Sequence, residues 1–341
     1  MRILALALMT VTSFTWTAKS MASEKLALLS QMNKYAGYND VWGYTDPNGR
    51  EYALLGVVNG TSVVDITDAP NIREVAFIES ANSIWKDIKT YKNYAYVVNE
   101  SGGGLQVLDL SDLPNSVKLV NTYTEIRTSH NIWVDEEAGL IYLEGNMIKP
   151  VIVLSLADPI HPVEISKFGV ECHDIYVRDH IAYIAEGYSG TFALFDMKDP
   201  AAPTLLKRFR IPNAGYVHNL WLTEDGSHLM STEETTGKTV KMWDISDLNN
   251  IHMTGEYLGP QKIMAHNTHI KGNYAYISHY ADGLRVVDIS DPTNITEVAN
   301  YWEPANAPNA WGAYPFFKSG KVLISGIETG LYVVQFDLGR E

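Results

Sequence analysis

The chain has 341 residues and a formal net charge of −14, and 46% of its residues are hydrophobic, including eight Trp and twenty Tyr. This composition excludes a disordered chain and supports a large core rich in aromatic side chains. The acidic balance excludes the basic surface that nucleic-acid-binding proteins present, so we expect no nucleic-acid partner.

The first residues have the pattern of a signal peptide. Arg2 precedes an apolar run over 3–11, and the small residues Ser20 and Ala22 stand where a signal peptidase would recognise them. We expect residues 1–22 to be removed and the protein to be exported to the periplasm or the extracellular space. The apolar run is too short to span a bilayer, and no later stretch is long enough, so we expect no transmembrane segment.

One sequence pattern opens seven successive units of the chain. Each opening places Asp, Asn or, in the last unit, Gly at a fixed position, and this column recurs every 43 to 48 residues, the length of a four-stranded propeller blade. The openings, each expected to begin an innermost strand, are 38–44, 85–91, 129–135, 172–178, 217–223, 265–271 and 310–316.

Three further strands are expected in each unit. The second, as in 51–57, is rich in β-branched and aromatic residues and is bounded by turn residues. The third is the most repetitive, as in 61–69 and 284–292, and we expect its terminal Asp-Pro or Asp-Leu to break it. The fourth returns beside the third, as in 74–80 and 297–303.

The sequence therefore predicts an all-β fold: a single seven-bladed β-propeller over 23–341 with four-stranded antiparallel blades. The seventh unit lacks a fourth strand, and the N-terminal segment 26–35 is expected to close the ring there, as an added strand or as a short helix on the rim. The expected blades lie near 38–80, 83–124, 129–169, 172–212, 217–258, 265–303 and 310–337 plus 26–35.

Several of these motifs resemble the LVIVD-repeat proteins of the choice-of-anchor B family. The resemblance rests on LRVVDISDP (284–292), VKMWDISDL (240–248), the opening 38–56 and the closing WGAYPFF (311–317). It implies an exported bacterial propeller that is often tethered to the cell surface. Only 338–341 follow the last expected strand, so we expect no sorting tail and expect periplasmic residence or free secretion.

Histidines occupy one column of the repeat in four successive units. Innermost strands surround the central channel of a propeller, so one column should form a ring at a single depth. These histidines are His130, His173, His218 and His266. Their equivalents in the other units are Asn39, Lys86 and Trp311. His269 lies three residues beyond His266, so strand alternation predicts that it faces the other side.

Polar residues also end the second strands, on the same face of the disc as the histidines. These residues are Asn99, Glu100, Glu144, Glu186, Glu233, Glu234 and His279. We take Asn99, Glu144, Glu186, Glu233 and His279 as candidates for the channel mouth. Imidazole and carboxylate groups together suit zinc, copper, nickel or iron, and the four histidines are the hypothetical metal ligands. Calcium is less favoured because no loop has alternating Asp residues. Alternatively, the histidines hydrogen-bond neighbouring strands and bind nothing.

Two functions follow from this pattern. The preferred interpretation is a binding module, without enzymatic activity, that takes an extracytoplasmic protein, peptide or glycan at one channel mouth. It is preferred because neither a G-x-S-x-G elbow nor a phosphate-binding loop is present. The alternative is a metal-dependent hydrolase or oxidoreductase with Glu186 or Glu233 as general base. The sequence assigns no catalytic residue and leaves the ligand and the oligomeric state open.

Overall fold

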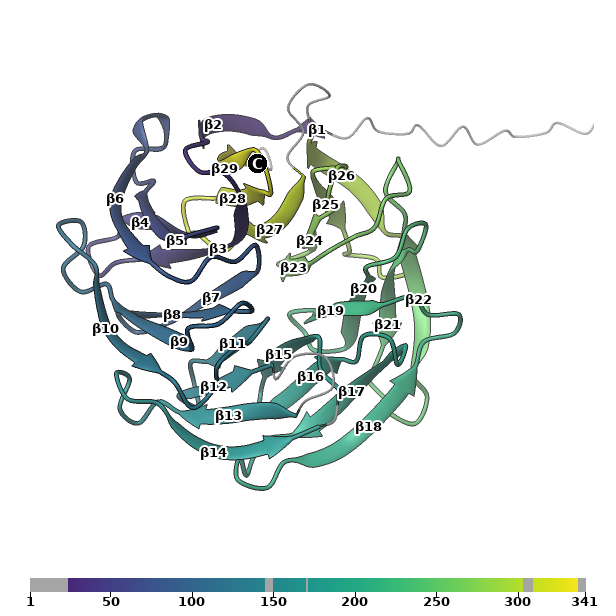
Figure 1. Cartoon of the computed structure of the whole chain (residues 1–341). Coiled ribbons are helices and arrows are strands. Elements are labelled where there is room, and N and C mark those ends of the chain that lie inside the picture. Colours follow the sequence, from purple (N-terminus) through teal and green to yellow (C-terminus); the bar gives the residue numbers. More distant parts are fainter. Residues whose placement is uncertain (1–23, 145–149, 170, 303–308, 337–341) are drawn as a thin grey trace, which may run out of the picture.

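A computed structural model describes residues 24–144, 150–169, 171–302 and 309–336, and shows seven β-sheets arranged around a central opening (Figure 1). Six sheets contain four antiparallel strands that are consecutive in the chain, and the seventh contains three such strands and one N-terminal strand, which confirms the predicted seven-bladed β-propeller. One 3-10 helix, η1 (Ala69–Asn71), is the sole helix in the described ranges. The predicted signal peptide lies outside them.

The blades are numbered one to seven by their innermost strands. These are β3 (Tyr38–Thr45), β7 (Lys86–Tyr91), β11 (Ile132–Asp135), β15 (Asp174–Arg178), β19 (Val217–Leu222), β23 (Thr268–Lys271) and β27 (Ala310–Tyr314). The second strands are β4 (Glu51–Val57), β8 (Tyr94–Asn99), β12 (Leu140–Leu143), β16 (Ile181–Ala185), β20 (His228–Glu233), β24 (Tyr274–Ser278) and β28 (Lys321–Gly326).

The outer half of each blade follows the same order. The third strands are β5 (Gly60–Asp65), β9 (Leu105–Asp109), β13 (Val151–Ser155), β17 (Thr191–Asp196), β21 (Val240–Asp244), β25 (Leu284–Asp288) and β29 (Gly330–Gln335). The outermost strands are β6 (Arg73–Glu79), β10 (Lys118–Tyr123), β14 (Val163–Phe168), β18 (Thr204–Arg210), β22 (His252–Tyr257), β26 (Thr296–Tyr301) and, in blade seven, β2 (Ala27–Met32).

The N-terminal residues join two blades. β2 pairs antiparallel with β29, so residues 27–32 form a strand and not a rim helix. Two residues earlier, β1 (Glu24–Lys25) pairs parallel with β26 and adds a short fifth strand to blade six. This fifth strand was not predicted, because a two-residue bridge has no periodicity that a sequence pattern could reveal.

Five of the third strands end earlier than predicted, at the first Asp of motifs such as V-D-I-S-D and not at the Asp-Pro or Asp-Leu that follows. The carboxylate of this Asp accepts a hydrogen bond from the backbone amide two residues on, which is the bond of an Asx turn. Such bonds run from Thr67 to Asp65 (3.0 Å), Ser111 to Asp109 (2.9 Å), Lys198 to Asp196 (2.9 Å), Ser246 to Asp244 (2.9 Å) and Ser290 to Asp288 (2.8 Å).

The hydrophobic core lies between neighbouring blades. Tyr52 and Leu54 of blade one, for example, share one buried cluster with Ile88 and Val97 of blade two. The face of each sheet is therefore covered by the next sheet, and the innermost strands are held at fixed positions around the channel. Among the described residues, no helix has the length and hydrophobicity required to cross a membrane.

Candidate functional site at one mouth of the channel

Side chains of the Asp/Asn column connect the innermost strands of neighbouring blades. Asp87 Oδ2 accepts hydrogen bonds from Asn131 Nδ2 (2.8 Å) and from the backbone amide of Ile132 (2.9 Å), both in the next blade. Asn219 donates to Asp174 Oδ2 (2.7 Å) and accepts from the amide of Thr268 (3.0 Å). These bonds fix the beginnings of the strands that carry the histidine column, so the column has a defined position.

The last member of the column is Gly312 because a side chain from blade one occupies the space beside it. A Cβ atom at Gly312 would lie 2.6 Å from Asp40 Oδ1. Burial, with the nearby carboxylate of Asp87, raises the pKa of Asp40. Lys89 lies 2.5 Å from Asp87 and 3.8 Å from Asp40, so a buried ammonium balances charge in the channel interior. Burial opposes ionisation of Asp87, but Lys89 and hydrogen bonds lower its pKa.

Six aromatic side chains from blades two to seven form a closed circle above this layer, which we call the imidazole–indole ring. It contains the four predicted histidines together with Trp85 and Trp311. Successive ring centroids lie 6.4 Å apart for Trp85–His130, 4.9 Å for His130–His173, 4.0 Å for His173–His218, 4.3 Å for His218–His266, 3.9 Å for His266–Trp311 and 4.4 Å for Trp311–Trp85.

Blade one contributes no side chain to this ring. Its column residue, Asn39, is fully buried and donates a hydrogen bond to the carbonyl of Ser83 (3.5 Å). Lys86, the column residue of blade two, has its ammonium between blades one and two, where it donates to the carbonyls of Val57 (2.7 Å) and Val58 (2.9 Å). Burial lowers the pKa of Lys86 to about 8. Trp85, one residue earlier, takes the ring position, which the column alignment did not predict.

Backbone carbonyls set the tautomers of two ring histidines. His173 Nδ1 lies 3.1 Å from the carbonyl oxygen of His218, and His266 Nδ1 lies 2.6 Å from that of Trp311. A carbonyl only accepts, so each Nδ1 carries the hydrogen and each Nε2 keeps a lone pair. Burial lowers the pKa of His173 and His218 well below the usual value and that of His266 to about 3. These three imidazoles are therefore neutral at pH 7.

His130 differs from the other three histidines. Its Nδ1 lies 3.2 Å from Glu100 Oε2. Burial opposes the charged form, but the hydrogen bond to Glu100 and the nearby carboxylate of Glu144 raise the pKa of His130 above its usual value. The ring thus combines three neutral imidazoles with one that attracts a proton.

The ring opens on one side into a cavity of about 190 Å³, which we call the mouth. It is lined by Trp85, Glu100, His130, Glu144, His173, Tyr216, His218, Glu234 and Trp311. The described lining thus includes three carboxylates and neither Lys nor Arg. Carboxylates and neutral imidazole nitrogens accept hydrogen bonds, so the mouth is rich in acceptor groups.

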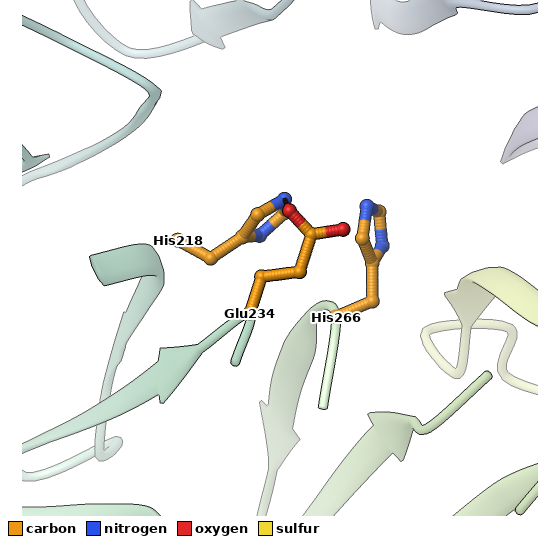
Figure 2. Close-up of side chains that lie close together, drawn as sticks. All are labelled: His218, Glu234 and His266. Atoms are coloured by element: carbon orange, nitrogen blue, oxygen red, sulfur yellow. Dashed lines mark ion pairs between the residues drawn. The ribbon is translucent and has the colours of Figure 1, made fainter. Parts of the chain in front are cut away.

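Glu234 is a candidate site residue that the sequence analysis did not select. Its carboxylate lies between the imidazoles of His218 and His266 (Figure 2), and donor atoms of these three residues lie within 4.8 Å of one another. Tyr280 donates a hydrogen bond to Glu234 Oε1, and burial raises the pKa of Glu234. Its neighbour Glu233 was chosen instead, and the sequence alone does not show which of two adjacent Glu residues faces the channel.

Four predicted mouth residues lie elsewhere. Glu233 accepts hydrogen bonds from Lys241 and from the amide of Gly215, and Glu186 binds Arg208 through two bonds of 2.8 Å. Asn99 donates a hydrogen bond to the carbonyl of Ala81 (2.7 Å). His279 Nδ1 lies 3.4 Å from the carboxylate of Asp282. None of these four lines the mouth cavity, because the position of a residue at a strand end does not determine the direction of its side chain. Glu144 does line the mouth.

The prediction for His269 was also wrong. His266 and His269 both line the channel, because His266 precedes β23, which begins at Thr268, and regular alternation does not extend back to it. At the opposite opening, of about 450 Å³, Trp42, Trp133 and Trp221 pack largely edge to face. These indoles contact side chains of neighbouring blades, as expected for a packing role.

Together, the sheets and the channel define a seven-bladed β-propeller with a polar site at one mouth. The LVIVD repeat matches this chain at residues 85–125 and 264–302, which contain most of blades two and six. The chain therefore contains LVIVD repeats. No curated protein matches it.

Solved structures show the same fold at low sequence identity. A putative 6-phosphogluconolactonase from Bacteroides uniformis is 15% identical with a TM-score of 0.62, over 75% of this chain and 82% of its own. The C-terminal WD40 domain of Sif2 is 11% identical with a TM-score of 0.63, over 93% of this chain and 99% of its own. At these identities the similarity establishes the fold alone.

Proposed function

We propose that the protein is a binding module that captures a cationic segment of a partner protein or peptide at the mouth. The observation that carries the proposal is the composition of the cavity lining. Among the described residues, the lining contains Glu100, Glu144 and Glu234 together with neutral imidazoles, and it contains neither Lys nor Arg. The side chains of Glu100 and Glu234 are 30% and 24% exposed, so a partner can reach them. Charge complementarity of this kind accelerates encounter and selects against acidic partners.

The proposed setting is outside the cytoplasm. The N-terminal signal pattern supports export, and the motifs that resemble the choice-of-anchor B family support membership of that family. The scaffold suits this role, since hydrogen bonds between neighbouring blades hold the strands that carry the ring. A protein or peptide is favoured over a glycan because the acceptor-rich mouth and the net charge of −14 both favour a positively charged group.

Peptide binding tests the proposal. Fluorescence anisotropy is measured with a labelled Arg-Gly repeat peptide, a Glu-Gly peptide of equal length and a labelled neutral oligosaccharide. We expect binding of the Arg peptide alone, weakened by salt and by Glu100→Gln or Glu234→Gln. Glu137→Gln, at the opposite opening, is the matched control and leaves binding unchanged. Equal binding of both peptides, or binding of the oligosaccharide alone, would contradict the proposal.

A metal-dependent hydrolase or oxidoreductase is the second candidate function. The observation that favours it is the convergence of His218, Glu234 and His266. The carboxylates of Glu186 and Glu233 are paired with Arg208 and Lys241, so neither is placed to act as the general base. Turnover of ester or phosphoester substrates that requires added metal and disappears in Glu234→Gln would support this function. Metal-loaded protein without turnover favours the binding module.

A further inference from the structure

We infer that His218, His266 and Glu234 form a binding site for one divalent transition-metal ion of the zinc type. This inference goes beyond the proposed binding of a partner, because it requires no partner and concerns only the side of the mouth formed by blades five and six. The three residues come from β19, from the position directly after β20 and from the segment preceding β23, and they converge on one point (Figure 2).

The donor set suits such an ion. Two imidazoles and one carboxylate are a common arrangement at zinc sites that leave one coordination position open. Imidazole nitrogen favours zinc, copper, nickel and iron over calcium and magnesium, which prefer oxygen ligands.

His266 provides the strongest argument. Its Nδ1 donates to the carbonyl of Trp311 (2.6 Å), which fixes the tautomer and orients Nε2 as a ligand, as outer-sphere carbonyls do in metalloproteins. Its Nε2 is buried and has no hydrogen-bond partner, and the side chain as a whole is 2% exposed. A role in bridging blades accounts for Nδ1 alone, whereas a metal ion would satisfy Nε2 as well.

His218 and Glu234 already lie close to the separation that two ligands of one metal ion need. His218 Nε2 lies 3.7 Å from Glu234 Oε2, which is longer than a hydrogen bond. Two ligands of a tetrahedral zinc ion lie roughly 3.3 Å apart when each bond is about 2.0 Å. The spacing of up to 4.8 Å among the three residues therefore requires a contraction of up to about 1.5 Å, and rotation of the partly exposed Glu234 side chain shortens the distances that include its carboxylate.

Direct metal titration tests the site. Full-length protein, first stripped with a chelator, is titrated with Co²⁺ and with Zn²⁺ alone, and the visible absorption of Co²⁺ and the heat of Zn²⁺ binding are recorded. We expect one ion per chain, and a Co²⁺ spectrum with the strong bands of a four-coordinate site. His266→Ala and Glu234→Gln are each expected to weaken binding by roughly 100-fold or more.

Matched controls separate this site from general effects. His252→Ala removes an exposed imidazole on outer strand β22 and leaves binding unchanged. Circular dichroism and thermal unfolding in chelator check the fold of each variant, and Glu234→Gln, which conserves shape, keeps the test valid if His266→Ala does not fold. Absence of stoichiometric Co²⁺ and Zn²⁺ binding, or equal affinity in Glu234→Gln, would overturn the inference. Peptide anisotropy reports on the partner separately, so either proposal can fail alone.

Discussion

Trp85 of blade two stacks on Trp311 of blade seven, with ring centroids 4.4 Å apart and planes inclined by 22°, although blade one lies between them in the circle of sheets. Asn39, the column residue of blade one, is buried and donates a hydrogen bond to the carbonyl of Ser83, so blade one places no aromatic ring between the two indoles. The contact completes the imidazole–indole ring and gives the mouth a continuous aromatic edge.

The indole stack predicts a stability contribution from Trp85. Trp85→Ala should lower the free energy of unfolding by about 2–3 kcal/mol, somewhat less than for a fully buried Trp, because the side chain is only partly buried. Urea denaturation followed by circular dichroism measures the change. Tyr188→Ala is the control, since Tyr188 is 81% exposed and its loss should change stability by no more than about 0.5 kcal/mol. Equal effects of the two variants would contradict the role of the stack.

The Asp/Asn column predicts a cost for removing a single amide. Asn131→Ala should destabilise the protein by about 1–3 kcal/mol, because it removes the donor to Asp87 and the acceptor of the Ile175 amide. Asn115→Ala, in an exposed turn, should have little effect. Chemical denaturation of both variants makes the comparison. A column without a linking role would leave Asn131→Ala as stable as the control.

Asp174 predicts an unusual pH dependence of stability. Burial, with the charge of Asp87, raises its pKa to about 7, although a hydrogen bond from Asn219 and the ammonium of Lys89 oppose the shift. The folded state therefore binds more protons than the unfolded state between about pH 4 and 7, and stability from this group is lost as the pH rises through that window.

Asp174→Asn should abolish the loss of stability that accompanies ionisation of Asp174. Relative to wild type, the variant should gain about 2–3 kcal/mol between pH 5 and pH 8, measured by urea denaturation in the presence of chelator. Asp225→Asn is the control. Hydrogen bonds from Thr223 and Ser227 lower the pKa of Asp225 to about 2, so its contribution is constant over this range. A difference between Asp174→Asn and wild type that does not vary with pH would contradict the assignment.

The pKa of His130 should depend on Glu100. The hydrogen bond to Glu100 raises the pKa of this histidine against the effect of burial. Glu100→Gln should therefore lower the pKa of His130, because burial then dominates. Nuclear magnetic resonance of imidazole nitrogens across a pH series measures the shift. Glu137→Gln, at the opposite opening, is the control and should leave the pKa of His130 unchanged. An unchanged pKa of His130 in Glu100→Gln would show that another group supports its charge.

The repeat made the fold predictable from sequence. A column recurring every 43 to 48 residues defines a blade, and seven such blades close a ring, so equivalent residues meet at one depth. The same logic predicts that the four histidines share one depth, and their imidazoles are neighbours in the structure. Metal binding by them remains a prediction.

Side-chain direction was the part that the repeat could not supply. Trp85 and Lys86 are neighbours, as are Glu233 and Glu234, and in each pair one residue faces the channel while the other packs between or within blades. A register shift between Val217 and Asn219, opposite the end of β20, interrupts regular alternation in blade five. Irregularities of this kind depend on contacts between blades, which a pattern within one unit does not encode.

Anomalous X-ray scattering from crystals of the zinc-loaded protein, recorded on both sides of the zinc absorption edge, tests the account of the mouth most directly. We expect one anomalous peak between Nε2 of His218, Nε2 of His266 and the carboxylate of Glu234, with the four ring histidines side by side. A peak at another position, or imidazoles that point away from the channel, would contradict the account.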